Sequence, residues 1–377
     1  MKTVWSELTT CRMLALTKAA LHDTTPDDTL FINTDETNWS EVFELSAAQG
    51  VMVLSFLGAM RLPKELHPPL KLKLRWIAGV EAVEKKYQHS VEVAKDLSAR
   101  FRENNIRMMV FKGLSLARLY PVPYSREFGD MDIFLCGKSA EGDALLEKLI
   151  GERYLTSKKH VNFSYRGILI ENHHHFINQG KDRKLHRSED LEKRLMNFLM
   201  EADKSEETNE NESFGSNDTV LFPPPDFDAL FVTLHLLVHL ANRIVLRHLC
   251  DLTKLFTVYN GKIDMSQYRH ALSETGLLNL ADAIISLSVR YLDLNPEFAP
   301  PYQSDVMLEN RLWNDMINPK VPTLSKEKHN VFAVLIFKIR MLQSNYWKYK
   351  MIFPGQFWKR IINSILFRIK NPKIFWQ

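Results

Sequence analysis

Apolar residues recur at helical spacing through the first hundred residues of the chain. Residues 38–62 predict two short helices that separate near Gly50, a residue type that commonly follows a helix end. Residues 71–104 carry apolar side chains, beginning with Leu74, at intervals of three and four with charges between them. This pattern predicts one long amphipathic helix, so residues 1–104 are expected to form an N-terminal helical region.

The pattern then changes to short apolar runs that are bounded by turn residues. Such runs predict strands at 107–111, 130–135, 154–159, 162–165 and 168–176, with helices at 113–119, 140–149 and 190–200. Interleaved strands and helices of this length indicate an α+β fold. We therefore expect residues 105–200 to form a core with a small mixed β-sheet, which helices flank on both sides in the sequence.

The rest of the chain divides by composition into three parts. Residues 201–225 begin acidic and polar and end in three prolines, which predicts a linker or a mobile loop. Residues 226–330 return to helical spacing and predict a helical domain. Residues 331–377 contain nine Lys or Arg residues, no Asp or Glu, and many aromatic residues. This tail fits either core-packed helices with solvated lysines or a peripheral contact with an anionic membrane surface.

Composition narrows the class of protein. The 377 residues are 45% hydrophobic and 25% charged, which is typical of a soluble globular protein, and the net charge of +4 is too small to indicate nucleic-acid binding. The three cysteines are widely spaced, which argues against a disulfide framework or a structural zinc site. The N-terminus lacks a signal-peptide pattern, and no run of 18 apolar residues occurs. These features predict a cytoplasmic location.

The candidate chemistry begins with two aspartates on the strand predicted at 130–135. Side chains alternate between the faces of a strand, so Asp130 and Asp132 point the same way, roughly 6.6–7 Å apart. Both carboxylates can then reach the same divalent cations, which prefer oxygen ligands. A pair of such ions is a known means of in-line displacement at phosphorus.

Residues upstream of the aspartates suit a phosphate. Gly113 begins a predicted helix, where free backbone N–H groups and a missing side chain allow a phosphate to approach. Ser115 can add a hydroxyl donor, and Arg126 can pair with a triphosphate through two parallel hydrogen bonds.

A third acid, Glu171, lies in the otherwise apolar strand predicted at 168–176. A buried carboxylate needs a partner, and a metal ion shared with the two aspartates provides one. Glu171 can also accept the proton of an attacking hydroxyl group. His173 shares its face of the strand and is expected to position groups of the site, with no zinc site among His173, His174 and His175.

Together these residues resemble the bacterial uncharacterised nucleotidyltransferase family of the polymerase-β-like superfamily, often associated with polysaccharide-biosynthesis loci. The residues that carry the resemblance are Lys112, Gly113, Leu119, Tyr120, Pro121, Arg126, Gly129, Asp130 and Asp132. The acid-x-His strand at Glu171 and a helical element from Arg247 to Asp251 also match. The resemblance extends over residues 38–260.

The resemblance implies transfer of a nucleoside monophosphate from ATP or another NTP to a hydroxyl or phosphate acceptor, with a sugar- or glycan-related acceptor suggested by association. It implies Mg²⁺ or Mn²⁺ as cofactor, held by Asp130, Asp132 and Glu171. The implied nucleotide-binding residues are Lys112, Gly113, Ser115, Arg126, Arg247 and Asp251.

Three alternatives remain open. Leu114 separates Gly113 from Ser115, and a glutamate replaces the usual third aspartate. A degenerate fold that acts as a non-catalytic binding partner, at a membrane surface or elsewhere, therefore competes with the enzyme. His235 and His239 have the spacing of a zinc pair but lack its glutamate, which favours ordinary helix histidines over a zinc hydrolase. Arg247 and Asp251 also have the spacing of a simple helix ion pair.

Overall fold

The computed structural model describes residues 4–150, 155–156, 159–177, 188–204, 220–320, 331–355, 357–358 and 362. Most of the linker predicted at 201–225, namely 205–219, and most of the tail beyond 355 lie outside the described residues.

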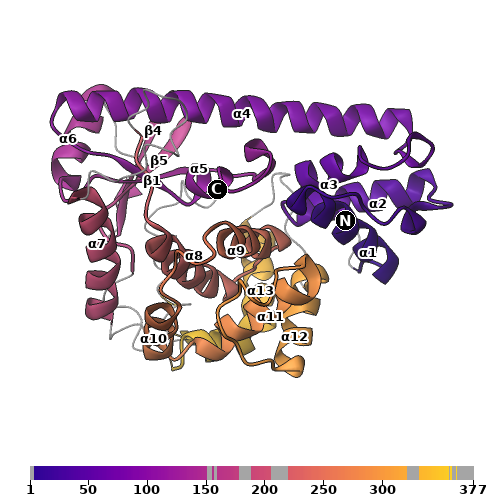
Figure 1. Cartoon of the computed structure of the whole chain (residues 1–377). Helices are drawn as coiled ribbons and strands as arrows, with labels where there is room; N and C mark the ends of the chain where they lie inside the picture. The colour runs from indigo at the N-terminus through magenta and orange to yellow at the C-terminus, as the bar shows by residue number, and fades with distance from the viewer. Residues whose placement is uncertain are drawn as a thin grey trace.

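Four helices form the N-terminal region (Figure 1): α1 (Glu7–His22), α2 (Glu36–Ala48), α3 (Met52–Ala59) and α4 (Leu70–Glu103). Helices α2 and α3 confirm the two helices predicted within 38–62. Asp35 caps α2 by accepting a hydrogen bond from the Asn38 N–H at 2.7 Å. Short 3₁₀ turns occur at Asp28–Phe31, Lys64–Leu66 and, later, Pro123–Ser125.

Helix α4 confirms the long helix predicted at 71–104, and it serves two parts of the molecule. Its first half is anchored by Trp76, which is fully buried and donates from Nε1 to the Met52 carbonyl at 2.9 Å. Its second half packs Val93 and Leu97 against the sheet. Leu74, expected on the buried face, is 58% exposed, because the buried stripe runs through Trp76 instead. One continuous helix therefore spans the N-terminal helices and the sheet (Figure 1).

The sheet has five strands in the order β1-β2-β5-β4-β3. The strands are β1 (Met109–Phe111), β2 (Met131–Phe134), β3 (Leu155–Thr156), β4 (His160–Tyr165) and β5 (Ile168–His173), and helices α5 (Gly113–Ala117) and α6 (Ser139–Ile150) lie between them in sequence. Strands β2 and β5 pair in parallel, and the other neighbours are antiparallel. The predicted α+β class with a small mixed sheet is confirmed.

Because side chains alternate between the two faces of the sheet, the strands contribute to two separate hydrophobic cores. Val110, Ile133 and Phe163 belong to a cluster with residues of α4 and α6 on one face of the sheet. Phe111 and Phe134 point to the other face and join the larger core of the helices. Asp132, His160, Asn162, Glu171 and His173 fall on this second face, so the fold directs them toward the helices that follow the sheet.

Those helices are α7 (Ser188–Lys204), α8 (Pro225–Leu240), α9 (Leu246–Val258), α10 (Met265–Thr275), α11 (Leu278–Leu292), α12 (Val306–Ile317) and α13 (Val331–Ile352). Helices α7 to α11 confirm the predicted helical spacing. Helix α12 had no counterpart in the sequence predictions; it buries Glu309, Leu312, Met316 and Ile317, whereas its apolar residues Val306 and Met307 are exposed.

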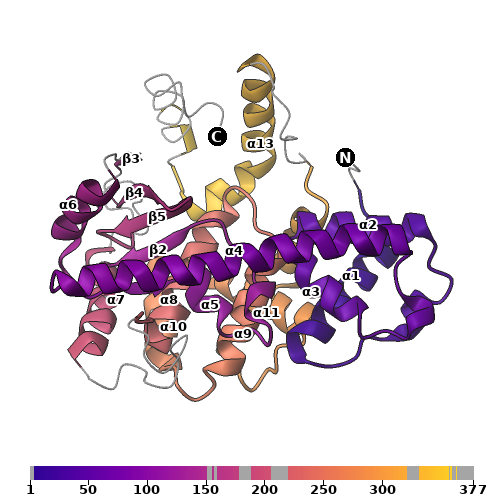
Figure 2. The ribbon, with the colours of Figure 1, turned by 90° about the horizontal axis from the view of Figure 1, so that it is seen from above.

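Helix α13 begins the basic aromatic tail and projects from the body of the protein (Figure 2). Its last two turns are attached: Asn345 donates to the Asn242 carbonyl at 2.7 Å, Lys348 pairs with Asp315, and Arg311 lies 3.9 Å over the Trp347 ring. Among the described residues, no helix has the length and apolar character needed to cross a membrane.

Candidate active site

A cavity of about 510 Å³ lies between the polar face of the sheet and helices α8 and α9. Its walls include all three acids predicted from the sequence, Asp130, Asp132 and Glu171, together with two lysines, Lys112 and Lys159. This volume suits a small molecule of nucleotide size.

The sheet register explains why the acids meet. Asp132 on β2 and Glu171 on β5 are directly opposite in the parallel pair. Neighbouring strands are about 4.8 Å apart, and opposite residues share a face. Asp130 lies two residues before Asp132, so it faces the same side. Residues 41 positions apart in the chain therefore present their carboxylates to one cavity.

Asp132 is the most buried of the three acids, and its charge is compensated on two sides. Lys112 Nζ forms an ion pair with Oδ1, and His173 Nε2 lies 2.8 Å from the same oxygen. Burial raises the pKa of Asp132, but Lys112 and His173 outweigh burial and hold that pKa well below its ordinary range. Burial and the charge of Asp132 raise the pKa of Asp130. The pair of aspartates is thus electrostatically unequal.

Lys112 and Lys159 bring positive charge to the acids. Lys112 precedes α5 with a backbone φ of 53°, which is sterically costly for a residue with a Cβ. That conformation directs the chain into α5 while the side chain reaches Asp132. Lys159 was not predicted from the sequence. Burial, with the charge of Lys112, lowers the pKa of Lys159 to about 8, so it is mostly a cation at neutral pH.

Gly113 lines the cavity and begins α5, which is shorter than the helix expected at 113–119. A Cβ at this position would lie 3.2 Å from the Asp130 carbonyl oxygen and 3.3 Å from the Phe128 ring. The missing side chain therefore lets α5 lie directly beside the segment that carries the first aspartate.

Ser115 lies away from the other predicted site residues. It is fully buried, and its hydroxyl donates to Asp228 Oδ2 on α8 at 3.4 Å. Its side chain connects α5 to α8 and does not line the cavity. The structure therefore does not bring the Ser115 hydroxyl together with the acids.

The Ser115 contact leads to a prediction about pH and stability. Burial raises the pKa of Asp228 to about 7, against the opposing effects of Arg118 and Ser115. A raised folded-state pKa means that the folded protein holds the proton more tightly, so stability is lost as pH rises from about 4 to about 7. Over about three pH units, at about 1.4 kcal/mol each, the effect approaches 4 kcal/mol.

Asp228→Asn is therefore expected to raise the free energy of unfolding at pH 8 and to change it little at pH 4.5. Urea titrations at both pH values measure the difference, with the exposed Asp190→Asn as the control. An equal effect of Asp228→Asn at the two pH values would contradict the assignment.

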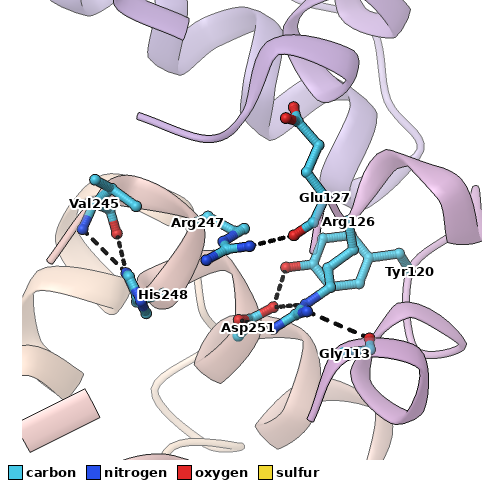
Figure 3. Close-up of polar contacts among 8 residues, drawn as sticks. All are labelled: Gly113, Tyr120, Arg126, Glu127, Val245, Arg247, His248 and Asp251. Atoms are coloured by element: carbon cyan, nitrogen blue, oxygen red, sulfur yellow. Dashed lines mark hydrogen bonds and ion pairs between the residues drawn. The ribbon is translucent and has the colours of Figure 1, made fainter. Parts of the chain in front are cut away.

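Arg126 joins the segment before β2 to helix α9 (Figure 3). Its Nε and Nη2 donate to the two carboxylate oxygens of Asp251, both at 2.9 Å, and Tyr120 donates to Oδ1 at 2.7 Å. Its Nη1 lies 3.4 Å from the Gly113 carbonyl. All these side chains are buried, so Arg126, predicted to pair with the triphosphate, and Asp251, predicted among the nucleotide-binding residues, bind each other.

Arg247 occupies the rim of the same region (Figure 3). Its Nη1 donates to the Glu127 carbonyl, and its side chain lines the cavity. The Asp251 carboxylate accepts hydrogen bonds from Arg126 and Tyr120. Arg247 therefore does not form the simple helix ion pair with Asp251 and instead contacts Glu127, which lies far away in the sequence. The predicted nucleotide-binding cations Lys112, Arg126 and Arg247 all line the cavity, but the guanidinium group of Arg126 is already paired with Asp251.

The far wall of the cavity carries His235, His239 and His248. The His235 and His239 rings are 4.3 Å apart, centroid to centroid, and His239 stacks on His248 at 6.4 Å. Burial and nearby Lys112 lower the pKa of both His235 and His239, so both rings are neutral at pH 7. His248 Nδ1 accepts a hydrogen bond from the Val245 N–H at 3.1 Å and thereby caps α9 (Figure 3).

Comparison with known proteins agrees with this geometry. The family model described as "Uncharacterised nucleotidyltransferase" matches residues 35–293. The chain belongs to this nucleotidyltransferase family. The match includes all of the cavity residues discussed above and supports transfer of a nucleoside monophosphate from an NTP as the general reaction. Neither the curated proteins nor the solved structures contain a match to the chain.

Proposed function

We propose that this nucleotidyltransferase transfers the monophosphate of an NTP to a hydroxyl or phosphate acceptor, with divalent cations held by Asp130, Asp132 and Glu171. The observation that carries the proposal is the convergence of these three acids, from two strands, on one cavity that also receives Lys112 and Lys159.

The donor set fits a divalent cation. Three carboxyl groups face one space, and the pKa of Asp130 is raised partly by the charge of Asp132, so an added positive charge relieves their repulsion. Hard cations such as Mg²⁺ and Mn²⁺ take oxygen ligands of this kind. When bound, such ions activate the attacking oxygen and neutralise the leaving pyrophosphate.

The lysines suit the triphosphate. Lys112 neutralises Asp132 in the protein alone, and the phosphate oxygens of an incoming NTP offer its ammonium group a second anionic partner. Lys159 and Arg247 add positive charge along the same wall. Arg126 acts as a positioning residue in this proposal, since Asp251 occupies its guanidinium group. Ser115 supports α5 through Asp228.

Glu171 can serve the acceptor as well as the metal. Burial raises the pKa of Glu171, but a hydrogen bond from His173 and the charges of His160 and Lys112 together outweigh burial and lower that pKa, so the carboxylate is ionised at neutral pH. An ionised carboxylate in the cavity can accept the proton of an attacking hydroxyl. The neutral imidazoles of His235 and His239 opposite offer hydrogen bonds to a polar acceptor, and a sugar hydroxyl or sugar phosphate is the class that we propose.

A thermal-shift comparison of ATP, CTP, GTP and UTP, each with Mg²⁺ or Mn²⁺, tests the proposal. A ligand that binds only the folded state at about a hundred times its Kd stabilises that state by about 2.7 kcal/mol. We expect one or more NTPs to raise Tm by several degrees only when the cation is present, because metal and triphosphate bind together.

The double variant Asp130→Asn/Asp132→Asn is expected to lose the metal-dependent part of this shift, whereas Asp190→Asn on the surface of α7 keeps it. A wild-type protein that gives no metal-dependent shift with any of the four NTPs refutes the proposal and leaves the non-catalytic binding partner as the better description.

A further inference from the structure

Two imidazoles stand beside the acids in an arrangement that the nucleotidyl-transfer proposal does not use. The ligand atoms of His160, Glu171 and His173 all lie within 4.8 Å of one another, and this is the metal-compatible group that the described residues contain. His160 on β4 is directly opposite His173 on β5, and Glu171 is two residues before His173. The three side chains therefore lie on the same face of the sheet, where the sheet borders the cavity.

The hydrogen bonds of His173 direct one ring nitrogen toward the acids. Its Nδ1 lies 3.3 Å from the His175 carbonyl oxygen, which can only accept, so this contact is a hydrogen bond in the tautomer that carries the proton on Nδ1. Its Nε2 then faces Asp132 Oδ1 at 2.8 Å and Glu171 Oε2 at 3.6 Å. The ring nitrogen and the two carboxylate oxygens therefore lie together in one small space, beside the Lys112 ammonium group. A backbone carbonyl on the other nitrogen is the usual outer partner of a metal-binding histidine.

The separations between these atoms are those of ligands around one ion. Bonds of about 2.0–2.2 Å place adjacent ligands about 3 Å apart and opposite ligands a little over 4 Å apart. The observed distances are 2.8 Å for His173 to Asp132, 3.6 Å for His173 to Glu171 and 3.8 Å for His160 Nε2 to Glu171 Oε1. Small rotations of these side chains are enough to complete the set.

We propose that His160, His173 and Glu171, with Asp132 as a shared carboxylate, form a mixed nitrogen and oxygen site for a first-row transition metal ion. Mg²⁺ favours oxygen ligands, whereas imidazole favours transition metals, and affinity rises from Mn²⁺ to Zn²⁺. The inference deepens the proposed function, on which it rests for its catalytic meaning, because it names the class of cation at one position. We expect the full chain without nucleotide to bind Zn²⁺ more tightly than Mn²⁺, and Mn²⁺ more tightly than Mg²⁺.

Pulsed electron paramagnetic resonance of Mn²⁺ bound to the nucleotide-free protein tests the inference directly. A directly bonded imidazole produces a ¹⁴N coupling, which we expect in the wild type. Zn²⁺ is expected to displace the Mn²⁺ signal, and Mg²⁺ to displace it only at far higher concentration. His160→Gln is expected to weaken Mn²⁺ binding by at least about tenfold.

His174→Gln is the matched control. His174 follows His173 but turns to the other side, where its Nε2 lies 2.9 Å from Asp143 Oδ2. This variant should keep the wild-type ¹⁴N coupling and Mn²⁺ affinity. The wild-type spectrum alone decides the question if His160→Gln fails to fold.

Bound Mn²⁺ without ¹⁴N coupling, the absence of Mn²⁺ binding, or equal displacement by Mg²⁺ and Zn²⁺ would overturn the inference. Its failure is distinguishable from failure of the proposed function. If Mn²⁺ shows no ¹⁴N coupling but NTP binding still depends on Mg²⁺, only the inference of a nitrogen-containing site is refuted. If Mn²⁺ shows ¹⁴N coupling but no NTP binds in a metal-dependent way, the proposed function is refuted and the metal site stands.

Discussion

Asp132→Asn is expected to lower the rate of nucleotidyl transfer by roughly 10³-fold or more, because metal stabilisation of transition-state charge is worth several kcal/mol. Asp132 contacts several groups of the site: Lys112 pairs with it, His173 lies 2.8 Å away, and Glu171 is its strand partner. Removal of its charge takes away the ligand shared by the proposed cations. Pyrophosphate release from the NTP selected by thermal shift measures the effect.

The same substitution also removes the anion between Lys112 and His173, so the variant is expected to be less stable. Asp282→Asn separates the two effects. Asp282 is equally buried and pairs with Arg269 on α10, outside the cavity. The control should lose stability and keep activity once the folded fraction is matched by circular dichroism. Comparable loss of activity in both variants would show that Asp132 acts through folding alone.

Asp251→Asn is expected to lower the free energy of unfolding by about 3–5 kcal/mol, because it leaves the buried guanidinium of Arg126 without its charge partner. Both side chains are less than a tenth exposed, and both carboxylate oxygens accept hydrogen bonds from Arg126 at 2.9 Å. The hydroxyl of Tyr120 loses a charged acceptor as well. Urea unfolding with and without the substitution measures the loss.

The double variant Arg126→Met/Asp251→Leu completes the test. Replacement of a buried ion pair by apolar residues of similar size is often close to neutral, so much of the stability should return. The double variant should nevertheless bind NTP less tightly, because the pair holds the segment before Asp130 against α9 across the cavity. A double variant less stable than Asp251→Asn would mean that the pair stabilises the fold beyond charge compensation.

Local patterns predicted much of this fold from the sequence. Helix α4 and strands β1, β2 and β5 follow from the spacing of apolar residues and from flanking turn residues, since these signals need no partner segment. The shared direction of Asp130 and Asp132 follows from strand alternation alone. Such information is local, and the structure agrees with it to within a few residues.

The prediction of other site residues required the correct strand bounds and the correct strand pairing. His160 was missed because β4 was expected to begin at Asn162, whereas the strand begins at His160, opposite His173. The alternation of His160, Asn162 and Ser164 with apolar neighbours was the available signal. Lys159 gave no signal, because a lone lysine before a strand is usually solvated, and only the approach of α8 buries it.

By itself, the sequence determined most types of element, the α+β class and the shared direction of Asp130 and Asp132, because hydrophobic periodicity and alternation act within a few residues. The tertiary structure decided which charges meet. Arg126 and Asp251 are 125 residues apart and bind each other, Ser115 binds Asp228 across 113 residues, and Asp132 lies beside His173. Pairing of charged groups depends on distance and burial in space, and the positions of the residues in the sequence do not specify either.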